Sequence, residues 1–190
     1  MQLQPNQGFY GKVNRILSGK DYYKAPNGAE ITVRKGTGTV EFTENGVLRI
    51  TNADKVVICG SKDDDKIHVV NSLIKYIAPG KGNNKTLLDN CTFKKYNNLW
   101  GTGSRIVTGG GLFSNYKKGS DKIQINGNFD AAILAQQGAG TVWGGDEKAH
   151  KDQILIKGNH SGYITVDSKD QVAIKGKKDG KIVNVSEIVM

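Results

Sequence analysis

A five-residue pattern recurs five times in this chain, always as Asp, then Lys or Gln, an aliphatic residue, a variable residue and a second aliphatic residue. The copies are DKVVI from Asp54, DKIHV from Asp65, DKIQI from Asp121, DQILI from Asp152 and DQVAI from Asp170. Side chains alternate between the two faces of a strand, so the third and fifth positions share one face. Each copy therefore predicts a strand with two aliphatic residues toward a core. The outward second and fourth positions, such as Lys122 and Gln124, are where we expect any function of the repeat to lie.

Further short strands are expected at several apolar runs, nearly all bounded by Gly, Asn or Asp. These runs are AEITVR (29–34), TVEFT (39–43), GVLRI (46–50), SLIKYIA (72–78), SRIV (104–107), AAILA (131–135), GYITV (162–166) and KIVNV (181–185). Many short strands predict an all-β protein, either a parallel β-solenoid or an antiparallel β-sandwich or barrel. A solenoid stacks equivalent positions from coil to coil, whereas successive strands of a sandwich have no reason to share one pattern. We therefore expect a parallel β-solenoid, in which each Asp accepts hydrogen bonds from backbone N–H groups ahead of it.

With 190 residues, the chain is long enough for one core and short for two, so residues 1–190 are expected to form a single domain. Only GKVNRILSG (11–19) is typical of a helix. Within residues 1–28, this segment could cap the first coil, which a solenoid needs against edge-to-edge association.

The positive charge is concentrated in the first two thirds of the chain. Lys and Arg outnumber Asp and Glu by 27 to 18, and residues 121–190 contain nine of each. The densest basic stretch runs from Lys81 to Lys118. Such a surface favours anionic partners. The alternative is a solvated lysine-rich surface that keeps the protein soluble.

Basic and aromatic residues alternate within this stretch, as in KKYNN and SNYKK, which is typical of a stacking platform for sugars or bases. The alternative is that these aromatic residues are partly buried packing. The candidate ligand-binding residues are Lys94, Lys95, Tyr96, Trp100, Arg105, Tyr116, Lys117 and Lys118. We expect the partner to be an anionic polysaccharide or an acidic protein surface. Nucleic acid stays open as an alternative partner, although no motif supports it.

Three stretches resemble the calcium-binding β-roll repeat of RTX proteins, in which an Asp precedes an inward aliphatic residue by two positions. GSKDDDKIH (60–68) is similar at Gly60, Asp65 and Ile67, YKKGSDKIQ (116–124) at Gly119, Asp121 and Ile123, and the copy at Asp152 at its Asp and Ile154. The resemblance implies calcium as the one cofactor to consider. Asp63, Asp64 and Asp65 form the best cluster of carboxylates for it.

Other stretches resemble the small right-handed β-helix of pectate lyases of the family-3 type. They are ADKVVICGSKDDDKIHV (53–69), NCTFKKYNNLW (90–100) and GGGLFSNYKKGSDKIQINGN (109–128). The resemblance implies a calcium-dependent polysaccharide lyase, with Lys94, Arg105, Lys117 or Lys118 as the base. However, the acidic turn that binds calcium in that family should follow Trp100, where this chain has GTGSRIV.

These observations favour a non-enzymatic binding module over a lyase, with a calcium-stabilised adhesive or structural repeat as a third hypothesis. No run of about 18 apolar residues is present, so no membrane span is expected. The N-terminus lacks the apolar stretch of a cleaved signal, and we expect an extracellular protein exported without one. No CxxC motif or His cluster accompanies Cys59 and Cys91, so we do not expect them to bind a metal. We expect buried free thiols on strands, and the alternative is a disulfide.

Overall fold

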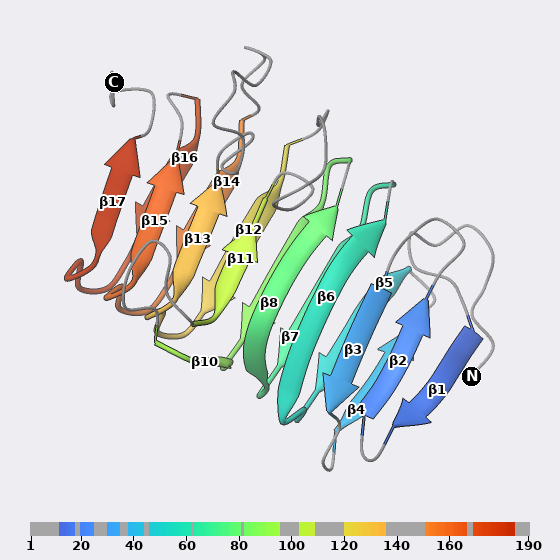
Figure 1. Ribbon diagram of the computed structural model, residues 1–190. Coiled ribbons are helices and arrows are strands. Elements are labelled where there is room, and N and C mark those ends of the chain that lie inside the picture. Colours follow the sequence, from blue (N-terminus) through green and yellow to red (C-terminus); the bar gives the residue numbers. More distant parts are fainter. Residues whose placement is uncertain are drawn as a thin grey trace.

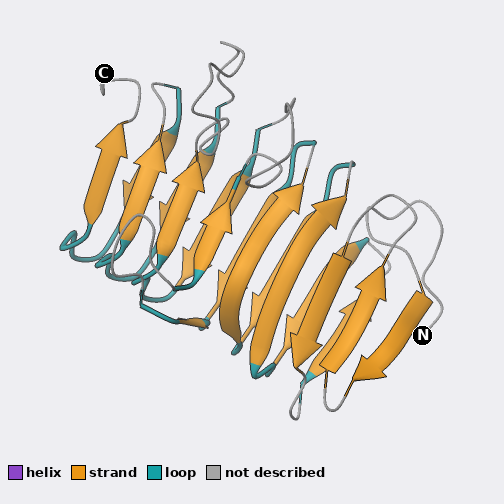
Figure 2. Ribbon diagram, viewed as in Figure 1, coloured by secondary structure: helices purple, strands orange, loops and turns teal. Residues whose placement is uncertain are grey.

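The chain is all-β, and the computed structural model contains no helix among the residues that it describes (Figure 2). These residues are 12–17, 20–24, 30–34, 38–43, 46–61, 63–80, 82–95, 103–108, 120–135, 151–166 and 169–184. The strands are β1 (Lys12–Leu17), β2 (Lys20–Lys24), β3 (Glu30–Arg34), β4 (Thr39–Phe42), β5 (Val47–Thr51), β6 (Lys55–Ser61), β7 (Lys66–Val70), β8 (Leu73–Gly80), β9 (Lys85–Asp89), β10 (Thr92–Phe93), β11 (Arg105–Val107), β12 (Lys122–Asn126), β13 (Ala132–Ala135), β14 (Gln153–Ile156), β15 (Tyr163–Val166), β16 (Gln171–Ile174) and β17 (Lys181–Asn184). Every apolar run expected to form a strand does so.

Two sheets lie face to face along the length of the molecule (Figure 1). The ten-stranded sheet has the order β1-β2-β3-β6-β8-β11-β13-β15-β17, with β10 also paired to β8, and the seven-stranded sheet has the order β16-β14-β12-β9-β7-β5-β4. From β5 onward the chain passes back and forth between the sheets, and the described strands from β5 to β17 pair with one another only in parallel. The chain is therefore coiled as a parallel β-solenoid, as the repeat predicts. Antiparallel pairing is confined to contacts made by β1 to β4.

The core between the sheets is a stack of aliphatic side chains in register. Ile67, Ile123 and Ile154 occupy equivalent positions on β7, β12 and β14, and each is 2% exposed. Val172 of the last coil extends the same stack and is half-buried. Burying each such side chain stabilises the fold by about 1.5 to 3 kcal/mol. The predicted inward direction of the third and fifth repeat positions is confirmed for these copies.

The aspartates of the repeat form a ladder that joins successive coils. The carboxylate of Asp121 accepts a hydrogen bond from the backbone N–H of Asn84 at 3.2 Å, and that of Asp152 accepts one from the N–H of Asp121 at 2.8 Å. The ladder continues with Asp170, which accepts from the N–H of Asp152 at 2.9 Å. Each side chain thus reaches back to the coil before it, so the expectation that it bonds N–H groups ahead of it was wrong. The ladder aligns the starts of the strands in the seven-stranded sheet.

One coil of this ladder does not match the five-residue pattern, because it has Asn in place of Asp. Asn84 occupies the Asp position of the segment NKTLL, and its Oδ1 accepts from the N–H of Asp65 at 2.8 Å. Thr86 fills the first aliphatic position of this rung and pairs in register with Ile67 and Ile123. Asn can replace Asp here because its carbonyl oxygen accepts the same hydrogen bond.

The copy at Asp54 does not belong to the ladder, although its sequence is nearly the same. Its strand, β6, lies in the ten-stranded sheet, and Asp54 is exposed. The equivalent turn on that side is joined instead by Ser72, whose hydroxyl accepts from the N–H of Ala53 at 2.9 Å. The five copies are therefore four stacked rungs and one strand of the opposite sheet.

A second set of polar side chains joins the coils at the turns. Three asparagines that end β5, β7 and β9 have left-handed backbones, with φ of 50° at Asn52, 48° at Asn71 and 49° at Asn90. Asn tolerates this conformation better than other side chains. Asn90 also donates from Nδ2 to Oδ1 of Asn71 at 2.9 Å. These turns send the chain from the seven-stranded to the ten-stranded sheet.

The expectation of a helix in this part of the chain was wrong. Lys12–Leu17 forms β1, which pairs antiparallel with β2 at the end of the ten-stranded sheet. His160 is fully buried, with its ring stacked on that of Phe129 at a centroid distance of 6.0 Å. The alternation of a strand cannot reveal this burial, because His160 lies between β14 and β15.

Candidate functional site

The outward face of the seven-stranded sheet presents one lysine on each of three neighbouring strands. Lys66 on β7 pairs in register with Lys85 on β9, and Lys85 pairs in register with Lys122 on β12. All three side chains are exposed. We call these three residues the lysine row. Neighbouring strands lie about 4.8 Å apart, so the row has one cationic side chain per coil at about that spacing.

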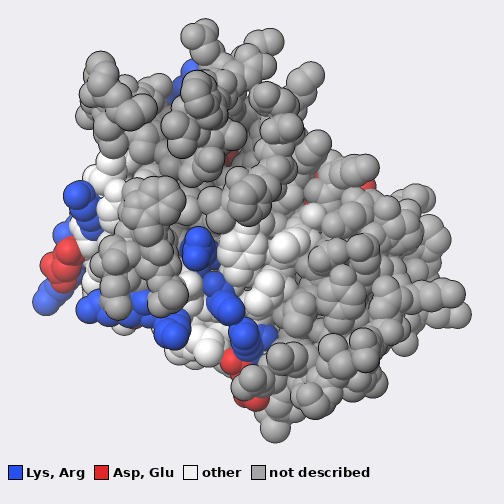
Figure 3. All heavy atoms as spheres, in the orientation of Figure 1, with Lys and Arg blue, Asp and Glu red and all other residues white. Residues whose placement is uncertain are grey.

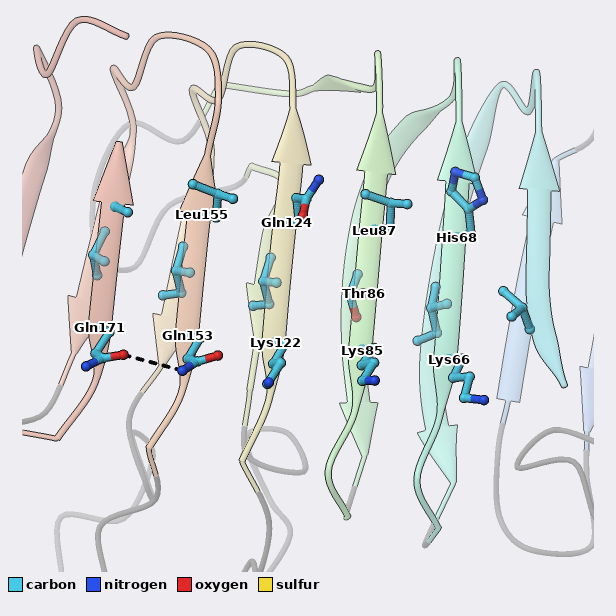
Figure 4. A pocket seen from close by; sticks show the side chains of 16 residues that line it. Lys66, His68, Lys85, Thr86, Leu87, Lys122, Gln124, Gln153, Leu155 and Gln171 are labelled. Carbon is cyan, nitrogen blue, oxygen red and sulfur yellow. Dashed lines mark hydrogen bonds between the residues drawn. The ribbon is translucent and has the colours of Figure 1, made fainter. Parts of the chain in front are cut away.

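Glutamines continue the lysine row on the next two strands (Figure 4). Gln153 on β14 pairs in register with Lys122, and Gln171 on β16 pairs with Gln153. The amide of Gln153 donates from Nε2 to Oε1 of Gln171 at 3.4 Å. The face therefore changes along the solenoid axis from three charged side chains to two uncharged polar ones.

These side chains line a groove of about 770 Å³ that crosses the strands, which we call the axial groove. The residues that line it are Val47, Lys66, Ile67, His68, Lys85, Thr86, Leu87, Lys122, Ile123, Gln124, Gln153, Ile154, Leu155, Gln171, Val172 and Ala173. A second outward row runs beside the lysine row and contains His68, Leu87, Gln124 and Leu155 (Figure 4). Leu87 and Leu155 are half-buried and give this side of the groove an apolar surface.

The axial groove is positively charged. None of its described lining residues is Asp or Glu, whereas three are Lys. Within the part of the chain that the structure describes, Lys85 and Lys122 form no ion pair. Like charges held side by side repel one another and attract anions. The groove therefore offers a linear cationic surface to an anionic ligand.

A chain of polar side chains fixes the histidine at one end of the groove. Nε2 of His68 lies 2.6 Å from Oδ2 of Asp89, and the other carboxylate oxygen of Asp89 accepts from Nδ2 of Asn126 at 2.5 Å. Gln124 donates to Asn126 at 2.9 Å. His68 is the fourth residue of its repeat copy and lies on the outward side of β7, as expected for that position. This network holds the second outward row in place.

Some residues of the predicted site lie together on the other sheet. Lys94 and Lys95 directly follow β10, and Arg105 begins β11. The N–H of Ser104 donates to the carbonyl of Lys94 at 2.8 Å, which brings the two segments together. Figure 3 shows Lys and Arg side chains gathered over β8, β10 and β11 on the face of the ten-stranded sheet. Tyr96, Trp100, Tyr116, Lys117 and Lys118 lie outside the described residues.

Arg105 is half-buried next to Tyr76 of β8, with which it pairs in register. Burial raises the pKa of Tyr76, and the positive charge of Arg105 partly opposes this rise. This contact ties Arg105 to the packing of the ten-stranded sheet. Lys94 and Lys95, by contrast, are exposed.

The three aspartates predicted to bind calcium do not share one environment. Asp63 and Asp64 are exposed, whereas Asp65 is 1% exposed at the start of β7. Oδ1 of Asp64 accepts from the N–H of Asn83 at 2.7 Å. No group of three or more His, Cys, Asp or Glu side chains suited to a metal occurs among the residues described. Calcium binding at this turn stays a prediction.

Sequence reasoning identified the outward repeat positions but missed the lysine row itself. Lys85 belongs to the rung headed by Asn84, which does not match the Asp pattern. Aligning the strands on Asx rather than on Asp would have placed Lys85 between Lys66 and Lys122.

The described residues include no helix that is long and apolar enough to cross a membrane. Comparison of the chain with family models, with curated proteins and with solved structures gave no match.

Proposed function

We propose that the protein is a non-enzymatic binding module that holds an anionic polysaccharide in the axial groove. The observation that supports this proposal is the register of Lys66, Lys85 and Lys122, which line a groove without any described acidic lining residue. Acidic polysaccharides are extended chains with charges at regular intervals, so a straight row of cations is complementary to them. The proposal includes an extracellular site of action, where such polymers are abundant.

The remaining groove residues suit a sugar chain as well as an anion. Gln124, Gln153 and Gln171 carry amides that both donate and accept hydrogen bonds, as hydroxyl groups require. Leu87 and Leu155 offer apolar contact to the C–H faces of the rings. Ligand sites generally combine such apolar surface with a few polar groups.

Binding to polygalacturonate and alginate tests the proposal, with uncharged dextran as the control ligand. We expect affinity for the two acidic polymers that falls with added salt, since exposed charge contacts are screened. The double variant Lys85→Gln/Lys122→Gln should bind about tenfold more weakly, at about 0.5 to 1 kcal/mol per lost charge contact.

The matched control is Lys75→Gln/Lys94→Gln, which removes the same charge from exposed positions of the other face. If this control weakens binding as much as the groove variant, the site is not the axial groove. Absence of binding to both acidic polymers at low salt would refute the proposed function. Formation of unsaturated sugar products, with or without calcium, would refute its non-enzymatic part in favour of a lyase.

A further inference from the structure

The direction in which a charged chain can lie in the axial groove is set by the outward residues. Along β9 the outward side chains are Lys85, Leu87 and Asp89, so an anionic chain parallel to this strand would meet one cation and then a carboxylate. Along β12 they are Lys122, Gln124 and Asn126, again with a single cation. On the described part of this face, successive lysines occur only in the direction across the strands, along the solenoid axis.

The spacing of those cations restricts the ligand further. Each of the three coils in the lysine row contributes one ammonium group, and the coils repeat at about 4.8 Å. A pyranose unit in an extended chain has about that length, so a chain with one carboxylate per unit matches the row. Duplex DNA carries one charge per about 1.7 Å of its axis, which is much denser than the row.

We propose that the axial groove binds an extended chain of which three successive units carry one charged group each and the next two units are uncharged. This inference rests on the proposed function and specifies its ligand. The three charged units lie at Lys66, Lys85 and Lys122, and the uncharged units lie at Gln153 and Gln171. The coupled amides of these glutamines bond hydroxyl groups but supply no charge for a fourth carboxylate.

The number of charged units in the site can be counted with oligomannuronates of two to eight residues. Affinity should rise about two- to fivefold with each residue up to three, in line with exposed charge contacts, and should then level off. In Lys122→Gln, which shortens the row to two lysines, the rise should end one residue earlier.

A gain-of-charge pair gives the sharpest control. Gln153→Lys extends the row to four and should move the levelling point from three residues to four. Ser161→Lys adds the same charge at an exposed turn outside the groove and should leave the levelling point at three. Thermal melts of all variants confirm that they are folded.

The outcomes separate the inference from the proposed function. Equal gains for every residue up to eight, or the same response in Gln153→Lys and Ser161→Lys, would overturn the charge register while polysaccharide binding stands. Failure of every oligomer and of polymeric alginate to bind would overturn the proposed function itself.

Discussion

Replacing Asp121 by Ala should destabilise the protein far more than replacing Asp54, although both residues begin nearly identical five-residue segments. Asp121 is 1% exposed, and its Oδ1 accepts from the backbone N–H of Asn84 at 3.2 Å and from Nδ2 of Asn84 at 2.9 Å. Asp54 is exposed at the start of β6. The two aspartates therefore have different structural roles, although the five-residue segments that they begin are nearly identical.

The magnitude follows from the donors that Asp121→Ala leaves without a partner. The buried N–H of Asn84 loses its carboxylate acceptor, which costs about 1 to 3 kcal/mol. The Nδ2 group keeps two long contacts of 3.4 Å, to the carbonyls of Gly80 and Gly82, so its loss is smaller. We expect a total of about 2 to 4 kcal/mol. For Asp54→Ala, a surface substitution, we expect a change within about 0.5 kcal/mol.

Urea unfolding, followed by circular dichroism, measures both variants against the natural chain. Asp121→Asn is the conservative control, because Asn84 shows that an amide oxygen can serve in this ladder, and it should lose less than half as much stability as Asp121→Ala. If Asp121→Ala and Asp54→Ala unfold within 0.5 kcal/mol of each other, on the order of the usual surface effect, the ladder does not stabilise the coils as reasoned.

Three other changes have defined outcomes. A Cβ at Gly60 would lie 1.6 Å from the carbonyl oxygen of Pro79, so Gly60→Ala should lower the free energy of unfolding by at least about 2 kcal/mol in a urea titration; full stability would contradict this close approach. Burial lowers the pKa of His160 below 6.5, so its contribution to stability is fully present above pH 6.5 and is lost as the pH falls through the lowered pKa. Melts from pH 7.5 to 5 should therefore show a smaller loss for His160→Gln than for the natural chain, and equal losses would argue against this role. Burial raises the pKa of Cys91 to about 11, so its thiol should resist iodoacetamide at pH 8 until urea unfolds the protein, and rapid alkylation of the native protein would contradict its packing.

The solenoid was predictable because equivalent strands of stacked coils have the same environment, so the same residue pattern recurs in the sequence. The aliphatic pairs such as Ile123 and Ile125 indicate which side chains face the core. The recurrence of the same five-residue pattern indicates that the strands stack in equivalent positions. The alternation alone could not separate Asp54 from Asp121, because the same strand pattern serves either sheet. Which sheet a strand joins depends on coil length, and the interval along the ladder varies from 18 residues between Asp152 and Asp170 to 37 between Asn84 and Asp121.

The first two strands, β1 and β2, escaped prediction for a different reason. The segment Lys12–Leu17 has apolar residues at a spacing that a helix can also use, and its pairing with β2 is a tertiary contact. Likewise, His160 is buried by packing against Phe129 and by a parallel bridge to it, which no local pattern encodes. Tertiary contacts overrode local preference at both places.

The sequence predicted the cationic character of the candidate site but not its location. The basic composition pointed to a cationic surface, and the repeat pointed separately to its outward positions, among which Lys122 was named. The density of lysines between Lys81 and Lys118 drew attention to Lys94, Lys95 and Arg105, which lie on the ten-stranded side. The lysine row depends on the register between strands of different coils. The density of lysines along the sequence gives no information about that register.

Lysine footprinting by acetylation and mass spectrometry, with and without alginate, tests the axial groove most directly. Bound ligand should slow the acetylation of Lys85 and Lys122 and leave that of Lys75, Lys94 and Lys95 unchanged. Protection of Lys94 and Lys95, with Lys85 and Lys122 reacting as in the free protein, would contradict the groove as the binding site.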